Sequence, residues 1–410
     1  MNLKRLLLLL TLFLAACGGE DAPATTAPQP TATTVAAAPT VTTVPTIPPT
    51  LPPPATVAAP PTTTPLPTAV IPPTTEPTPT TATTLADGLV LVNREDFGTT
   101  RNIFTGEEVT NPDVLDRRPI ACKLSNFPAQ WTRPQAGLNN ADILFEHVTE
   151  GRLTRFTALF YSNPPEQLGP IRSARLIDVE LPAMYDAALC FSGASQGVNS
   201  KLNSSDFYDR ILRSWEPGYY RTGENKPLEH TFYARPASLW NSLETAGQNS
   251  RPNPTTQMAF SENPPDGGQP VSKISMNYVS ENVFWQHYPS DNRYRRWSDG
   301  VQHLDANTGQ QVNFRNVVAV FAPHVDDANI CEEIRNSQCV ALSVEIQLWG
   351  QGRAVIFRDG LMFEGTWYRQ ARNDMLTFRD AAGNPIPLQL GNTMVQILTT
   401  EPLEQLTTEP

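Results

Sequence analysis

The N-terminal part of this 410-residue chain lacks the side chains from which a protein core is built. Residues 21–86 include no aromatic residue and only two charged ones, Asp21 and Glu76. The stretch consists mainly of 18 prolines, 22 threonines and 13 alanines. Because it could bury little apolar surface, folding would not offset the loss of chain entropy. We expect a disordered linker that favours the extended polyproline II conformation.

The first hydrophobic run is too short to cross a membrane as a helix. It occupies residues 6–14, is interrupted by Thr11 and follows the basic residues Lys4 and Arg5. This length and charge are typical of a signal peptide. Leu-Ala-Ala-Cys follows at once, and Cys17 is placed as in a bacterial lipobox, where the cysteine is diacylated and becomes the new N-terminus after cleavage. The alternative is an ordinary signal peptide with an incidental cysteine.

We therefore expect residues 1–16 to be a signal peptide and residues 17–87 to be the lipidated cysteine with its linker. The lipid would anchor the protein in the cell membrane and leave it extracytoplasmic. The formal net charge of the chain is −11, with an isoelectric point near 5.0. This acidity argues against binding of nucleic acid and against electrostatic attraction to anionic lipid.

The cysteines and histidines show no metal-site spacing. No Cys-x-x-Cys or His-Glu-x-x-His pattern occurs, so we expect neither a metal nor a cofactor. Cys331 and Cys339 enclose a polar segment and are predicted to form a disulfide in the oxidising envelope. Cys122 and Cys190 lie in apolar runs, where they either pair across neighbouring strands or remain free thiols.

The rest of the chain predicts two folded parts. A segment rich in Pro, Gly and Asn at 247–270 reads as an interdomain linker. Before it, residues 88–246 combine short apolar strand-like runs with helical spacing at 176–188 and 204–215, and the segment 236–247 ends at a glycine as a helix does. After it, residues 271–410 are strand-like throughout. The expected fold is a mixed α/β domain followed by a β-rich domain.

Several motifs of unusual wording occur in order. They are RRPIACKLSN, RPQAGLNNAD, EHVTEGRLTRFTALF and GPIRSAR in the first part, and NVVAVF, GRAVIFRDG, GTWYR and GNTMVQIL in the second. Together they resemble the DUF3048 family, the YerB-like bacterial lipoproteins, over about residues 100–400. The resemblance implies a two-part envelope lipoprotein. It implies no reaction, because the family has no established activity.

Polar residues concentrate at the expected strand ends of the first part. Asp142, Glu146 and Glu150 are spaced four apart, so on a strand they would share a face and could act as an acid and a base on a glycan. Arginines there could clamp a carboxylate or phosphate. The alternative is a buried network that orders the strand ends. The predicted ligand-binding residues are Asn126, Arg133, Gln135, Asp142, Glu146, Glu150, Arg155, Arg172 and Arg175.

Ser195 lies in a Gly-x-Ser-x-Gly pattern after a strand-like run, as a hydrolase nucleophile would. Asp206 or Asp209, followed by His230 or His287, would complete the order of a catalytic triad. No oxyanion segment of the His-Gly-Gly-Gly type precedes it, and so short a pattern also arises by chance. Ser195 and Glu150 are therefore weak catalytic candidates.

We expect a surface-tethered lipoprotein without catalytic activity. Its folded part would bind a glycan or peptide of the cell wall, or a protein that synthesises the wall. One alternative is a hydrolase of an envelope polymer that uses Glu146 and Glu150, or Ser195. Another is a solute-binding lipoprotein for small molecules.

Overall fold

The computed structural model describes residues 88–400 and 405–410. The predicted signal peptide, Cys17 and the linker at 17–87 lie outside the described residues. Within them, no helix is both long enough and apolar enough to cross a membrane. The described residues belong to one compact unit that spans 79–410.

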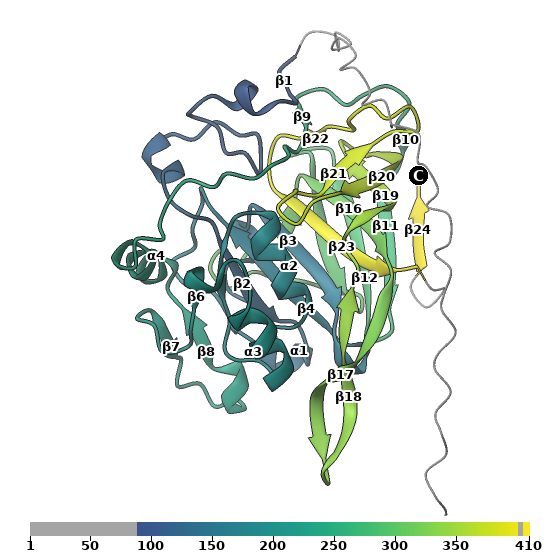
Figure 1. The fold of residues 1–410 in the computed structure, drawn as a ribbon. Helices are drawn as coiled ribbons and strands as arrows, with labels where there is room; N and C mark the ends of the chain where they lie inside the picture. The colour runs from purple at the N-terminus through teal and green to yellow at the C-terminus, as the bar shows by residue number, and fades with distance from the viewer. Residues whose placement is uncertain (1–87, 401–404) are drawn as a thin grey trace, which may run out of the picture. The chain divides into compact units, whose positions relative to one another are not determined.

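A large central sheet organises the structure (Figure 1). It has 11 strands, of which β21 (Thr377–Arg379) pairs with β20 at one side. In spatial order the other strands are β10 (Gln269–Pro270), β20 (Leu361–Arg369), β19 (Gly350–Arg358), β16 (Asn316–Ala322), β23 (Thr393–Thr399), β3 (Ile143–Val148), β4 (Thr154–Phe160), β2 (Ile120–Ser125), β5 (Ala188–Cys190) and β6 (Ile211–Leu212).

Seven strands of this sheet run in the same direction: β20, β16, β23, β3, β2, β5 and β6. β19 is antiparallel to both β20 and β16. β23 pairs in parallel with both β16 and β3, and β5 pairs in parallel with both β2 and β6. β4 lies between β3 and β2 and is antiparallel to both, which makes β3 and β2 parallel in direction. The carboxyl ends of all seven strands therefore lie at one edge, which we call the strand-end edge.

A second sheet covers one face of the central sheet. Its strands are β14 (Val301–Gln302), β13 (Arg293–Ser298), β12 (Glu281–Tyr288), β11 (Lys273–Tyr278) and β24 (Gln405–Glu409), with β15 (Asn313–Phe314) on β13. Residues along β11 to β13 alternate between buried and more exposed positions, as expected of a sheet with one face in the core. Ile274 and Trp285 belong to the same buried cluster as Leu144 and Phe156 of the central sheet.

Helix α2 (Ile177–Met184) covers the opposite face. It packs in a second buried cluster, in which Ile177 and Leu181 join Ile143 and Phe145 of β3. The other helices are α1 (Ala129–Thr132), α3 (Gln196–Asn203) and α4 (Pro236–Thr245), with 3-10 turns η1 (Arg94–Phe97), η2 (Pro112–Leu115), η3 (Leu138–Asn140), η4 (Glu150–Arg152), η5 (Tyr208–Arg210) and η6 (Leu228–His230). The α4 helix has proline at its first position, where the missing N–H costs nothing.

Three small sheets complete the described part. They are the hairpin β17 (His324–Arg335) and β18 (Gln338–Ile346), the pair β7 (Tyr219–Arg221) and β8 (Phe232–Ala234), and the set β1 (Val90–Leu91), β9 (Phe260–Ser261) and β22 (Leu388–Gln389). The β17–β18 hairpin extends away from the rest of the fold (Figure 1).

The mixed α and β fold, rich in strands, confirms the predicted fold class. The helix expected at 236–247 is present as α4. The prediction of a helix at 204–215 was wrong, because this segment forms η5 and then β6, whose Ile211 and Leu212 pair with β5. Burial of two apolar residues at the sheet edge decides the structure there, and helical spacing does not.

Strands from both predicted domains belong to the central sheet. β3 of the first part pairs with β23 of the second, from Ile143 opposite Thr393 to Glu146 opposite Gln396. The segment 247–270, predicted as a linker, contributes β9 and β10 to two of the sheets. Residues 88–246 alone would therefore leave the edge of β3 without its partner strand.

This pairing predicts that residues 88–246, produced alone, do not reach the native fold. Without β23, the edge of β3 would expose unpaired backbone groups, and apolar side chains that the second part of the chain buries would face water. We expect a poorly dispersed proton–nitrogen NMR spectrum for residues 88–246 and a well-dispersed one for residues 88–410. A dispersed spectrum from the shorter fragment would contradict the shared sheet.

Candidate functional site

The strand-end edge is the natural place for a ligand site in this architecture. In open α/β sheets, ligands bind outside the carboxyl ends of the parallel strands, where neighbouring connections diverge. Here the divergence occurs at β4, which is inserted between β3 and β2 and starts at the same edge. The residues that follow β3 and those that begin β4 therefore lie side by side.

Glu150 and Arg155 occupy these two positions. Glu150 begins the η4 turn directly after β3, and Arg155 is near the start of β4. Glu150 accepts a hydrogen bond of 2.5 Å from the Nε of Arg175 and pairs with Arg155 at 3.4 Å. Burial alone would raise the pKa of Glu150, but Arg175 and Arg155 hold it below its usual value. The carboxylate is therefore ionised and held between two guanidinium groups.

A residue that the sequence did not indicate joins this cluster. Glu332 of β17, with 2% of its side chain exposed, lies 3.4 Å from Arg175. Its Oε1 accepts hydrogen bonds from the hydroxyls of Ser195, at 3.2 Å, and Ser343, at 2.8 Å. Glu332 lies in a polar segment between two cysteines that resembled a loop, so no local pattern marked it as buried. It ties the hairpin to the strand-end edge.

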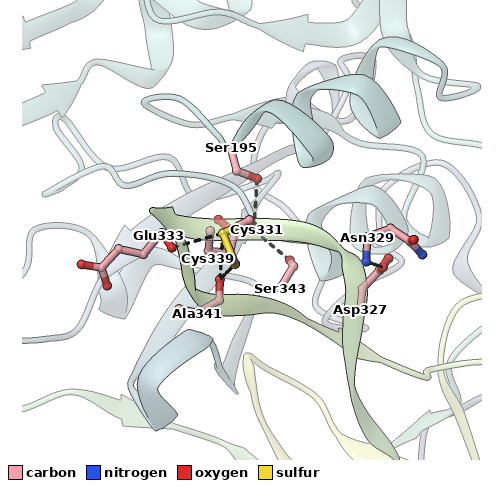
Figure 2. Close-up of a disulfide and its surroundings, with 9 residues drawn as sticks. Ser195, Asp327, Asn329, Cys331, Glu333, Cys339, Ala341 and Ser343 are labelled. Carbon is pink, nitrogen blue, oxygen red and sulfur yellow. Dashed lines mark hydrogen bonds between the residues drawn. A yellow bond between two sulfur atoms is a disulfide. The ribbon is translucent and has the colours of Figure 1, made fainter. Parts of the chain in front are cut away.

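The disulfide predicted between Cys331 and Cys339 is present, with a Cα–Cα distance of 5.8 Å. It links β17 to β18 next to Glu332, and Figure 2 shows Ser195 reaching toward the hairpin beside it. An isolated two-stranded hairpin is marginally stable in water, so the cross-link and the Glu332 contacts together stabilise it.

Arg172 differs from the other arginines of the edge. Its guanidinium makes no hydrogen bond to any residue that the structure describes, and its Nε is buried. Glu229 and Glu150 lie near enough to influence its charge, as does the cation of Arg175. Of the predicted ligand-binding arginines, Arg172 is thus the one whose charge is not already committed to a described hydrogen-bond partner.

A groove of about 760 Å³ opens beside this cluster. One wall is the turn formed by residues 148–153, which includes Glu150 and Arg152. The other wall is the β17–β18 hairpin, including the consecutive residues 339–342 of β18. In the described part of the chain, β18 pairs only with β17, so its second edge keeps free backbone groups next to the groove.

Four predicted ligand-binding residues belong instead to a buried network between the two large sheets. Glu146 is fully buried and accepts hydrogen bonds from Arg296 at 2.9 Å, Gln396 at 2.9 Å and Asn126 at 3.0 Å. Glu281 of β12, which the sequence did not indicate, also accepts a hydrogen bond from Arg296, at 2.7 Å. The four predicted residues in this network are Asn126, Arg133, Gln135 and Glu146.

The network engages most polar atoms of these side chains, although the buried Nε of Arg133 has no partner among the described residues. The Nη2 of Arg133 donates to Glu281 at 2.8 Å and to Asn126 at 2.9 Å. Gln135 donates to the Ser125 carbonyl at 3.0 Å and accepts from His303 at 2.7 Å. These contacts engage the side chains of Asn126, Gln135 and Glu146, which are all buried. The alternative of a buried network describes them.

Asp142 lies in a third environment, just before β3 at the opposite edge of the sheet. Its carboxylate accepts hydrogen bonds from Asn102 at 2.5 Å and from the backbone N–H of Tyr161 at 2.6 Å. Burial raises the pKa of Asp142 to about 6. Asp142, Glu146 and Glu150 therefore form no common acidic face, and the acid–base pair expected from their spacing is absent.

Ser195 is not placed as a nucleophile. It caps the N-terminus of α3, where its hydroxyl accepts from the N–H of Val198 at 3.4 Å, and it donates to Glu332. Of the expected partners, Asp206 pairs with Arg372 at 2.9 Å and His287 contacts Asn292. No histidine among the described residues contacts Ser195, so the triad hypothesis is not supported by the geometry.

The remaining cysteines answer the question that the sequence left open. Cys122 of β2 lies opposite Cys190 of β5 in the sheet, and both are buried, free thiols.

A second buried ionic contact lies on the face of the central sheet that α2 covers. There the buried Lys123 contacts Asp178 at 2.8 Å and His147 at 2.6 Å. Burial lowers the pKa of Lys123 to about 8. A lysine inside an apolar strand-like run is the sequence feature from which this ionic pair could have been predicted. Among the described residues, no group of His, Cys, Asp or Glu could hold a metal ion.

The buried network makes a prediction about acid stability. Burial alone would raise the pKa of Glu281, but Arg296 and Arg133 lower it to about 2 in the folded state. Because this value lies below the unfolded one, the contribution to stability is complete above about pH 4.5 and is lost as pH falls toward 2. Glu281→Gln should lower the free energy of unfolding near neutral pH by about 3 kcal/mol and flatten its decline in acid.

Urea denaturation at a series of pH values measures both effects. Glu364→Gln is the matched control, because Glu364 pairs with Arg353 at the surface and both side chains are about half exposed. Such pairs contribute about 0–1 kcal/mol. An acid slope in Glu281→Gln as steep as in the wild type would show that Glu281 does not carry this dependence.

Comparisons with known proteins agree on one family. Residues 104–249 match the family described as "Protein of unknown function (DUF3048) N-terminal domain", and residues 274–395 match its C-terminal domain. The chain is 29% identical over 295 residues to "Putative lipoprotein YerB" of Bacillus subtilis (strain 168), covering 70% of this chain and 83% of that protein. The crystal structure of YerB from Bacillus subtilis superposes with a TM-score of 0.62 at 27% identity, over 75% of this chain and 99% of that one. The chain therefore belongs to the DUF3048 family, with both its N-terminal and its C-terminal domain.

Proposed function

We propose that this protein is a lipoprotein, anchored outside the cell membrane through Cys17, whose folded part binds a polypeptide of the cell envelope. The signal peptide and lipobox pattern support the anchor, and a relative named as a lipoprotein agrees with it. The polypeptide is either the peptide of the cell wall or a segment of a protein that synthesises the wall.

The groove at the strand-end edge is the observation that carries this proposal. It lies beside Glu150, at the sheet edge where an open α/β architecture places its ligands. Its volume of about 760 Å³ is within the range of ligand sites in proteins. One of its walls is a strand with an unpaired edge, which is the feature that recognises extended peptides by main-chain hydrogen bonds.

The side chains of the groove suit a peptide. Val340 and Leu342 of β18, with Leu153 of the facing turn, provide apolar surface for side chains of an added strand. Charges of both signs border the groove, among them those of Glu150, Arg152, Asp326, Glu333 and Arg335. Such a mixture fits a polar peptide better than a polyanion, for which one sign would dominate.

Catalysis has less support. Glu146 is closed to a substrate, and no histidine in the described part of the chain contacts Ser195 to remove its proton. The carboxylate of Glu150 is engaged by Arg175 and Arg155, which keeps it charged and unsuited to act as a general acid.

Selection of random displayed peptides on the purified full-length protein tests the proposal. We expect enriched peptides whose affinity falls by about tenfold or more in Val340→Asp, because the new charge would lie in the groove. Val301→Asp is the matched control, since Val301 is 68% exposed on β14 and Val340 is 50% exposed on β18.

Two outcomes of this selection would contradict the proposal. Selection that enriches no binding peptide would contradict a peptide site in the groove. Peptides that bind Val340→Asp and Val301→Asp equally well would show that the binding site lies elsewhere on the protein.

A further inference from the structure

The second sheet has an outer face that the proposed peptide groove does not use. Along β11, Ile274 and Met276 are buried, so Lys273, Ser275 and Asn277 point the other way. The same alternation applies to β12 and β13, where Val283, Trp285, Tyr294 and Arg296 are buried. The outer face consists of Lys273, Ser275, Asn277, Asn282, Phe284, Gln286, Tyr288, Arg293, Arg295 and Trp297.

Three aromatic rings form a strip on this face. Phe284 lies opposite Trp297 across β12 and β13, and their rings stack with centroids 4.9 Å apart and planes within 10°. The ring of Tyr288 is parallel to that of Trp297 within 9°, at 6.4 Å. None of the three is fully buried. Cross-strand aromatic pairs stabilise a sheet, but they also present apolar surface to whatever meets the outer face.

Two of the three cations on the outer face are paired with an anion. Lys273 lies over the ring of Phe284 and forms an ion pair of 2.5 Å with Glu409. Arg295 lies over the ring of Tyr288 and forms an ion pair of 2.6 Å with Asp291. Lys273 and Arg295 thus each have an anion beside them, whereas Arg293 donates hydrogen bonds to the amide oxygens of Asn313 and Asn392. Because the carboxylate of Asp299 lies at the adjoining groove, the face as a whole still carries little net charge. A single-stranded nucleic acid, which needs a positive groove beside its stacking rings, is a poor fit.

Polar groups, most of them uncharged, border the strip at one end. A groove of about 450 Å³ adjoins Phe284 and is lined by Ser275, Asn277, Asn282 and Thr407, together with one cation and one anion, Lys273 and Asp299. The side-chain amides of Asn277 and Asn282 form no hydrogen bond with any residue within the described ranges 88–400 and 405–410, and both residues are exposed. Each amide offers two donors and one acceptor group to a ligand.

From this combination we infer that the outer face binds a neutral glycan. The C–H faces of sugar rings are apolar and pack against aromatic rings, whereas sugar hydroxyls need donors and acceptors such as amides and hydroxyls. Both requirements are met within one groove and the strip beside it. The face is close to neutral, which matches a neutral ligand and gives a polyanion no electrostatic attraction.

The glycan face shares no residue with the peptide groove at the strand-end edge. A test of glycan binding can therefore fail while the proposed peptide binding holds, and the reverse. With both sites present, one protein could hold a glycan and a peptide together, and linked sites of this kind gain affinity through effective concentration.

The test uses the purified full-length protein and neutral hexasaccharides of glucose, mannose, galactose and N-acetylglucosamine, with binding measured by calorimetry. We expect at least one hexasaccharide to bind, and its affinity to fall by about tenfold or more in Trp297→Ala. Because Trp297→Ala also removes a cross-strand pair, the double variant Asn277→Ala/Asn282→Ala provides a second reading at exposed positions that should leave folding unchanged. Trp349→Ala is the control, since Trp349 is 47% exposed and not on this face.

The inference is overturned if none of the four hexasaccharides binds the wild type. It is also overturned if the asparagine double variant binds as tightly as the wild type, because the ligand would then lie elsewhere. Tighter binding of an oligodeoxythymidine than of every hexasaccharide, lost in Trp297→Ala, would assign the face to a nucleic acid instead.

Discussion

One buried arginine joins the two large sheets. Arg296 lies on β13 and is fully buried, yet it contacts Glu146 of β3 and Glu281 of β12. Taking these charges out of water costs several kcal/mol per ion, which only close partners can offset. Arg296 is paired with two carboxylates, and its Nη1 donates a hydrogen bond to His303. The two sheets can therefore pack in only a few ways that leave no charge without a partner.

This constraint reaches the strand-end edge through β3. The same strand carries Glu146 at its centre, pairs with β23 from the far end of the chain, and leads directly into Glu150. With β3 fixed by the buried network, Glu150 is held where Arg175 and Arg155 meet it. Glu332 extends the ionic cluster to the β17–β18 hairpin and so sets the width of the peptide groove. The residues predicted as one ligand site thus divide into a structural part and an accessible part.

How far the sequence predicts the structure depends on the range of the interaction. Local signals worked for α4, which begins at Pro236, and for the disulfide, whose spacing suits a hairpin. They failed at 204–215, where pairing with β5 overrides helical spacing. The domain pattern showed two strand-containing parts, but parallel pairing of β3 with β23 joins segments about 250 residues apart, and no local pattern encodes it.

The candidate site shows the same limit. The position of Glu150 and Arg155 at strand ends could be predicted, because charged residues interrupt apolar runs there. Glu146 has the same appearance in the sequence, yet its partners Arg296 and Gln396 lie 150 and 250 residues away. Without them, a buried ionic network and an open site look alike. The stacked rings of Phe284 and Trp297 were also hidden, because only the register of β12 and β13 places them opposite one another.

Native-state hydrogen exchange of residues 88–410 in increasing urea tests the central claim most directly. If Arg296 and its partners join the sheets into one cooperative unit, the protected amides of β3, β23 and β13 should converge on a single unfolding free energy. Arg296→Met would lower that common value for all three strands together. Separate values, with β11 to β13 opening while β3 and β23 stay protected, would contradict the account, because the second sheet would then unfold independently of the edge that it is said to hold.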